Sequence, residues 1–199
     1  SKMSLSKVYL LHGNCIVDAR KKPANGTERE LIALAMWASE PIPFDPMEIA
    51  LHDAYLKTGI ADERSDYKMI HEYPLGGKPP MMTHLFENGT GKRIIAAKGA
   101  PEALISLSNL NNNEKRQVTD AIETLAVEGY RVLAVGEANF TGGNFPATQQ
   151  EFPFVFKGLV AFYDPPKKNI SAVLEAFYQA GIAVKIITGD NAETTAAIA

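Results

Sequence analysis

The pattern of apolar and polar positions predicts an α+β arrangement for most of the chain. Segments rich in β-branched and aromatic residues, bounded by glycine, proline or asparagine, predict strands. A hairpin is predicted around residues 87–91, where Asn88-Gly89 would supply the positive φ angles of the turn. Looser alternation covers residues 4–19, and the other predicted strands lie at residues 66–75, 79–86, 92–99, 130–137 and 154–163.

Capping signals and apolar residues at helical spacing predict helices between these strands. Asp45 is expected to cap a helix in which Pro46 takes the first helical position and which extends to about Lys57. A longer helix is expected to be capped by Asn112 or Asn113. Helices and strands therefore mix along the chain, as in an antiparallel sheet with flanking helices.

The pattern changes towards the end of the chain. A strand at 154–163, a turn, a helix at 168–180 and a strand at 182–187 predict a β-α-β unit with parallel strands. In such folds ligands bind beyond the carboxyl ends of the strands, where Asp164 and residues 188–190 fall. A Rossmann-like sheet needs more than two strands, so we expect this chain to be part of a longer protein.

Composition excludes several classes of protein. The chain has 199 residues, of which 46% are hydrophobic and 22% charged, as in a folded globular protein. Its net charge of −3 gives no electrostatic support for nucleic-acid binding. Residues 1–10 contain no apolar h-region, and no apolar run approaches the ~20 residues that cross a bilayer, so we expect no signal peptide and a soluble chain on the cytoplasmic side. The four histidines show no metal-ligand spacing, and no metal site is expected.

Motifs in a particular order resemble the cytoplasmic part of P-type cation-transporting ATPases. They are ASEPIPFDPMEIAL (38–51), AAKGAPEAL (96–104), GYRVLAVG (129–136), DPPK (164–167) and ITGDNAETTAAIA (187–199). The resemblance covers nearly the whole chain. It implies that residues 1–156 form the nucleotide-binding (N) domain and residues 157–199 the truncated start of the phosphorylation (P) domain, which is Rossmann-like.

The resemblance implies that the parent protein is a membrane pump. It would couple ATP hydrolysis, through an aspartyl-phosphate intermediate, to cation transport, with Mg²⁺ neutralising phosphate charge and with the calcium-type branch favoured. This chain would bind ATP and act with the remainder of the P domain, the actuator domain and the membrane helices. Because it lacks the phosphorylated aspartate, it is expected to have no catalytic residue and to hydrolyse nothing.

The resemblance also implies ATP-binding residues, each of which has a simpler structural interpretation. Lys98 and Gly99 would contact the adenosine portion; alternatively, Lys98 is a solvated lysine at a strand end. Arg131 would bind the triphosphate; alternatively, it pairs with an acid on the surface. Glu48 would accept a hydrogen bond from the adenine amino group; alternatively, it completes a capping box with Asp45.

The segment EYPLGGKPPMM (72–82) departs from the family pattern. Leu75 stands where many members have an aromatic residue that stacks on adenine, and Pro80 stands where they have a lysine. Lys78 or Tyr73 could substitute. We expect weaker adenine binding, by a ring–ring term of about 0.5–1.5 kcal/mol, or a rebuilt pocket. Without the resemblance, Leu75 would be interpreted as a strand core residue.

Two further sites come from the end of the chain. By resemblance, Thr188 and Gly189 approach the transferred phosphoryl group and Asp190 approaches phosphate or ribose, at a helix amino terminus that suits anions. The simpler interpretation is helix capping by Asp190 or Asn191. The predicted hinge between the domains consists of Asp164, Pro165 and Pro166.

Two other functions stay open at this point. One is a non-catalytic nucleotide-sensing module. The other is a fragment of a haloacid-dehalogenase-like phosphatase, which shares the Rossmann-like core but needs its own nucleophilic aspartate near the amino terminus. No Asp-x-Asp or Asp-x-Thr motif precedes residue 18, which disfavours the phosphatase.

Overall fold

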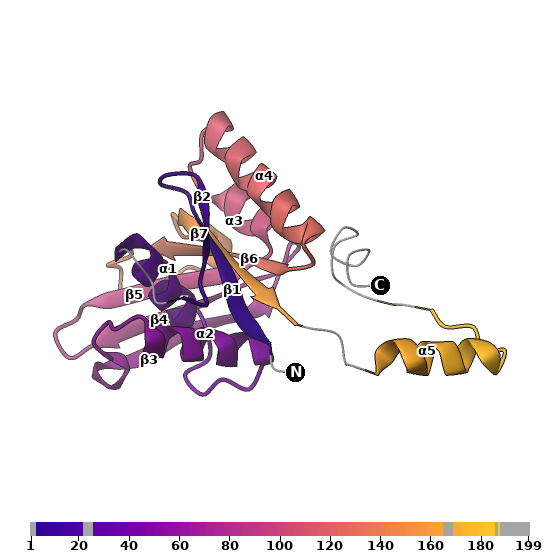
Figure 1. Cartoon of the computed structure of the whole chain (residues 1–199). Coiled ribbons are helices and arrows are strands. Elements are labelled where there is room, and N and C mark those ends of the chain that lie inside the picture. The colour runs from indigo at the N-terminus through magenta and orange to yellow at the C-terminus, as the bar shows by residue number, and fades with distance from the viewer. Residues whose placement is uncertain (1–2, 22–25, 165–168, 186, 188–199) are drawn as a thin grey trace.

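A seven-stranded antiparallel sheet forms the centre of the computed structural model, which describes residues 3–21, 26–164, 169–185 and 187 (Figure 1). The strand order is β2-β1-β7-β6-β5-β4-β3, and every neighbouring pair is antiparallel. The strands are β1 (Ser4–Leu10), β2 (Cys15–Asp18), β3 (Tyr67–Gly76), β4 (Met81–Asn88), β5 (Arg93–Gly99), β6 (Arg131–Ala138) and β7 (Val155–Tyr163). The predicted α+β class with an antiparallel sheet is confirmed.

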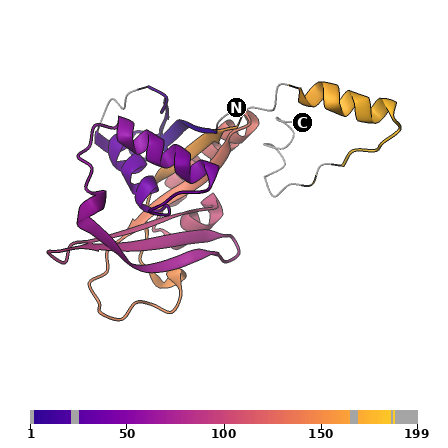
Figure 2. The same cartoon turned by 90° about the horizontal axis from the view of Figure 1, so that it is seen from below.

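Helices cover both faces of this sheet (Figures 1 and 2). The helices α1 (Gly26–Trp37) and α2 (Pro46–Lys57) pack on one face, and α3 (Pro101–Leu107) and α4 (Asn112–Val127) pack on the other. Each face has its own apolar core: Leu51 and Phe162 belong to the first, and Leu104, Leu125 and Leu159 to the second. The remaining helical elements are two short 3₁₀ turns, η1 (Arg64–Asp66) and η2 (Gln149–Glu151), and the helix α5 (Ile170–Gln179).

The strand β7 lies in the middle of the sheet, antiparallel to both β1 and β6. We expected this segment to begin a parallel β-α-β unit. Its side chains alternate between the two cores, with Val160 and Phe162 in one and Leu159 and Ala161 in the other. A strand covered on both faces is apolar throughout, and this pattern is also typical of parallel strands. The apolar run therefore indicated burial on both sides and not strand direction.

The helix α5 lies apart from both faces of the sheet (Figures 1 and 2), and none of its side chains is buried in the described structure. Residues 182–185 and 187, where we predicted a second strand, have no regular structure. A parallel strand at 182–187 would need a neighbouring strand to hydrogen-bond with, and the seven described strands all belong to the antiparallel sheet. The Rossmann-like unit stays a prediction.

Two local predictions need correction. The cap of α4 is Asn111, one residue earlier than predicted, and it forms a capping box with Glu114. In the β4–β5 turn, the positive φ falls at Gly91 (81°) and not at Asn88-Gly89. The side chain of Asn88 instead accepts hydrogen bonds from backbone N–H groups within the turn. An asparagine side chain that binds the backbone offers a second way to close such a turn.

Candidate functional site

Lys98 and Glu48 form a buried ion pair between the sheet and α2. Lys98 is the penultimate residue of β5, and Glu48 lies in the first turn of α2. The Lys98 Nζ atom is 2.6 Å from Glu48 Oε1, and the two residues are only 4% and 5% exposed. Nζ also donates hydrogen bonds to the Ala38 carbonyl oxygen (2.7 Å) and to Ser39 Oγ (3.0 Å). The ammonium group thus has three acceptors, which is what a buried lysine requires.

The contacts of Glu48 rule out its simpler interpretation. Asp45 caps α2 by accepting a hydrogen bond from the Met47 amide (2.8 Å), but Glu48 does not complete a capping box. Its Oε1 atom accepts from the Glu40 amide (3.3 Å) as well as from Lys98. Its Oε2 atom is buried and has no hydrogen-bond partner among the described residues. Glu48 therefore keeps one free acceptor inside the site.

Burial dominates the electrostatics of the pair. Desolvation lowers the pKa of Lys98, while the hydrogen bond and the charge of Glu48 oppose that shift. The simpler interpretation of Lys98 as a solvated lysine at a strand end is therefore wrong, because its side chain is buried. Sequence reasoning also missed Ser39 and Glu40, whose contacts with the pair depend on how α1 packs against β5 and carry no local sequence signal.

A pocket of ≈ 360 Å³ shares one residue, Ser39, with the surroundings of this pair, but neither Lys98 nor Glu48 lines it. The Ser39 hydroxyl oxygen accepts a hydrogen bond from Lys98, and Ser39 is one of the residues that line the pocket. The other lining residues are Met36, Trp37, Pro41, His52, Arg64, Ser65, Tyr67, Met69 and Phe86. Apolar and aromatic walls with a few polar groups are typical of sites for small organic ligands.

Leu75 and Lys78 are both exposed. Leu75 is 66% exposed near the end of β3, so its interpretation as a strand core residue is wrong. Lys78 follows in the turn that leads to β4. Tyr73 is not available as a substitute for the family's aromatic residue, because it is buried in the core under α3 and α4 and its hydroxyl donates to the Pro146 carbonyl oxygen.

Gly99 and Arg131 lie on the two neighbouring strands next to the pair: Gly99 follows Lys98 at the end of β5, and Arg131 begins β6. A Cβ atom on Gly99 would lie 2.5 Å from Met81 Cα, so this glycine is needed for the close packing of β4 on β5. Arg131 begins β6 and is partly buried. Val135, opposite Lys98 in the register, is four residues from Arg131, so Lys98 and Arg131 share a face of the sheet. The predicted roles of both residues towards ATP stay predictions.

The remaining predicted residues lie at the end of the chain. Asp164 is exposed directly after β7. Pro165, Pro166, Thr188, Gly189 and Asp190 fall outside the described residues. In the part of the chain that the structure describes, no helix is both long enough and apolar enough to cross a membrane.

Comparison with known proteins gives matches over most of the chain. The family model described as "P-type ATPase, cytoplasmic domain N" matches residues 42–169. A calcium-transporting ATPase of Bacillus subtilis is 35% identical over 168 residues, which cover 78% of this chain and 19% of that protein. A sodium/potassium exporting P-type ATPase of Schizosaccharomyces pombe is 32% identical over 167 residues, covering 78% of this chain and 16% of that protein. The chain therefore spans about a fifth or less of the length of these relatives.

Proposed function

The chain belongs to the P-type ATPases, as their cytoplasmic domain N, and from this premise we propose that it binds ATP for a cation pump. The parent protein would transfer the γ-phosphate to an aspartate outside this chain and use the aspartyl-phosphate to drive cation transport. Mg²⁺ would neutralise the phosphate charge in the complete protein. Three of the similar proteins bear the name calcium-transporting ATPase, which favours calcium as the cation.

The buried Lys98–Glu48 pair beside the pocket is the observation that carries this proposal. The free Oε2 atom of Glu48 suits a hydrogen bond from an adenine amino group. The neighbouring pocket offers the apolar surface that a nucleobase needs. Leu75 and Lys78 are exposed near the β3–β4 turn and would contact the ligand at the end of the sheet where Lys98 lies. Arg131, on the same face of the sheet as Lys98, would bind the phosphates.

We further propose that the domain junction lies after Tyr163. The boundary that we predicted after residue 156 falls inside β7, whose pairing with β1 and β6 supports assigning the whole strand to domain N. Asp164 would then begin the hinge. The exposed apolar side chains of α5, among them Val173 and Phe177, would cover the sheet of the P domain in the complete protein.

Titration of the ¹⁵N-labelled chain with ATP, followed by amide chemical shifts, tests the ATP-binding role. We expect saturable shifts around Glu48, Leu75, Lys98 and Arg131. Leu75→Ala changes an exposed side chain and should weaken binding without disturbing the fold. Val127→Ala on α4 is the matched control, because Val127 is also 66% exposed but lies on the opposite face of the sheet. Absence of saturable shifts at millimolar ATP would overturn the proposal.

A further inference from the structure

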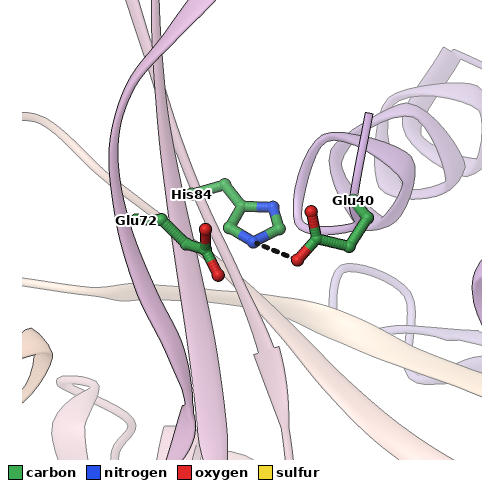
Figure 3. A group of neighbouring side chains, drawn as sticks. All are labelled: Glu40, Glu72 and His84. Carbon is green, nitrogen blue, oxygen red and sulfur yellow. Dashed lines mark ion pairs between the residues drawn. The ribbon is translucent and has the colours of Figure 1, made fainter. Parts of the chain in front are cut away.

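Three side chains distant in the sequence converge next to the Lys98–Glu48 pair. Glu72 on β3 lies directly opposite His84 on β4, and opposed residues of an antiparallel pair project from the same face. Glu40 follows α1. Figure 3 shows the His84 ring between the two carboxylates. One ligand atom from each residue lies within 4.8 Å of the others, and His84 Nε2 is 3.9 Å from Glu40 Oε1.

The ring nitrogens of His84 have different roles. Nδ1 lies 3.0 Å from the Ser39 carbonyl oxygen. Because a carbonyl oxygen only accepts, Nδ1 carries the proton and donates it, which leaves the lone pair on Nε2. Nε2 points towards the carboxylates, is fully buried, and has no hydrogen-bond partner among the described residues. A histidine whose second nitrogen donates to a backbone carbonyl is oriented as metal-binding histidines usually are.

The main chain of Glu40 is held in place from two sides. Its amide donates to Glu48 Oε1 (3.3 Å), and its carbonyl oxygen accepts from His52 Nε2 (3.0 Å). Its side chain is partly exposed and Glu72 is exposed, so both carboxylates have room to move. Ligand atoms of a tetrahedral Zn²⁺ lie about 3.3 Å apart, given bond lengths near 2.0–2.2 Å. Small side-chain rotations would therefore bring the three ligand atoms to that spacing.

The charges around the cluster also favour a cation. Two carboxylates lie on either side of a buried imidazole ring. The nearby Lys98 ammonium is already paired with Glu48, so it does not neutralise these two carboxylates. Glu40 and Glu72 therefore leave local negative charge that a divalent ion would offset.

We propose that Glu40, Glu72 and His84 bind a divalent transition-metal ion, with Zn²⁺ preferred, through two carboxylate oxygens and His84 Nε2. A mixed nitrogen and oxygen ligand set suits Zn²⁺ better than the all-oxygen sites of Ca²⁺ or Mg²⁺. Water would fill the open position. The ion would tie β3 and β4 to the segment after α1, at the edge of the proposed ATP pocket, and so goes beyond the proposed function.

Zn²⁺ titration of the untagged chain, without nucleotide, tests this proposal independently of ATP binding. A Cys15→Ser background removes the exposed thiol as a competing ligand. We expect saturable binding of one ion, a rise in melting temperature, and, with Co²⁺ as probe, visible absorption bands of a low-coordinate site. Thermal stabilisation follows because the ion binds the folded state.

Two variants and a control separate this site from adventitious binding. Glu72→Gln changes an exposed side chain, and His84→Asn keeps a donor for the Ser39 carbonyl oxygen but removes the Nε2 ligand. Each should weaken Zn²⁺ binding by at least the roughly 10–100-fold that follows loss of a supporting group. Glu123→Gln, an exposed acid on α4, should change nothing. Equal Zn²⁺ affinity in all of these variants, or no saturable binding to the unmodified site, would overturn the proposal.

Discussion

The ammonium group of Lys98 and the carboxylate of Glu48 meet at 2.6 Å inside the protein, although 50 positions separate the two residues in the sequence. The pair joins the end of β5 to the start of α2, and its ammonium group donates to Ser39, a residue that lines the pocket. Because both groups are buried, neither has water to replace a lost partner. Its disruption should therefore affect stability as well as ligand binding.

Replacing Lys98 by methionine should lower the free energy of unfolding by about 3–5 kcal/mol, because it leaves the Glu48 carboxylate buried without a cation. The double change Lys98→Met and Glu48→Gln should recover much of this loss. Urea unfolding measures both. The matched control is Lys157→Met, which breaks a half-exposed pair with Glu137 and should cost less than about 1 kcal/mol. Equal losses in the two single variants would contradict the prediction.

Replacing Leu75 by phenylalanine should strengthen ATP binding. The side chain is exposed, so a ring can be introduced without repacking the core, and it would restore the aromatic surface that the family resemblance implies for adenine. A stacking gain of about 0.5–1.5 kcal/mol corresponds to a roughly 2–12-fold lower Kd. The amide-shift titration provides the measurement. Val127→Phe should leave the Kd unchanged, and an equal effect in both variants would show that the ring acts non-specifically.

Replacing Gly99 by alanine should destabilise the protein by about 1–3 kcal/mol, because the new methyl group would collide with the backbone of Pro80 and of Met81, the first residue of β4. Gly89→Ala is the control, since a Cβ there meets nothing within 4 Å. It should shift stability by no more than about 0.5 kcal/mol. Urea unfolding midpoints compare the two variants. A Gly99→Ala variant as stable as the unmodified chain would mean that β4 and β5 can separate locally around Met81.

Stability should fall as the pH drops below about 6.5, partly through His52. Burial lowers the pKa of His52 from its ordinary value of 6.5, and Nδ1 accepts a hydrogen bond from Arg64 Nη1 (3.1 Å) that a protonated ring would lose. The unfolded chain thus binds the proton more tightly than the folded one. The contribution of His52 is complete above pH 6.5 and declines as the pH falls from there towards the folded-state pKa.

Melting temperatures measured from pH 7.5 to 5.5 in the presence of a chelator check this dependence. His52→Gln removes the titrating group and should flatten the slope. His12, which lies on the exposed β1–β2 turn, is the matched control. His12→Gln should keep the slope of the unmodified chain, and a slope that His52→Gln leaves unchanged would exclude His52 as its source.

Local patterns in the sequence were enough to predict most elements of this fold. The β4–β5 hairpin and the Asp45 cap depend on neighbours within a few residues, and both formed where expected. The position of β7 did not follow from such patterns. Its apolar run indicated burial on both faces, but one of its two neighbours is β1, which lies more than a hundred residues earlier in the sequence.

The candidate site was predictable only in part, for the same reason. Lys98 and Glu48 could be named from the family motifs, but their direct contact could not. The convergence of Glu40 and Glu72 on His84 requires both the β3–β4 register and the packing of α1 on the sheet. No spacing within the sequence signals that arrangement, and for that reason no metal site was expected at the four histidines.

The pairing of β1 with β7 has a mechanical consequence. Ser4 and Tyr163 are partners in the register, so the first and last strands along the chain, β1 and β7, are neighbours. The Cα atoms of these two residues are about 5 Å apart. When the chain enters and leaves a domain at adjacent points, the domain can rotate as a rigid body about these points without any strand sliding past another. The same geometry would let it be cut out, or spliced into a loop of a different host protein, with little distortion of either partner.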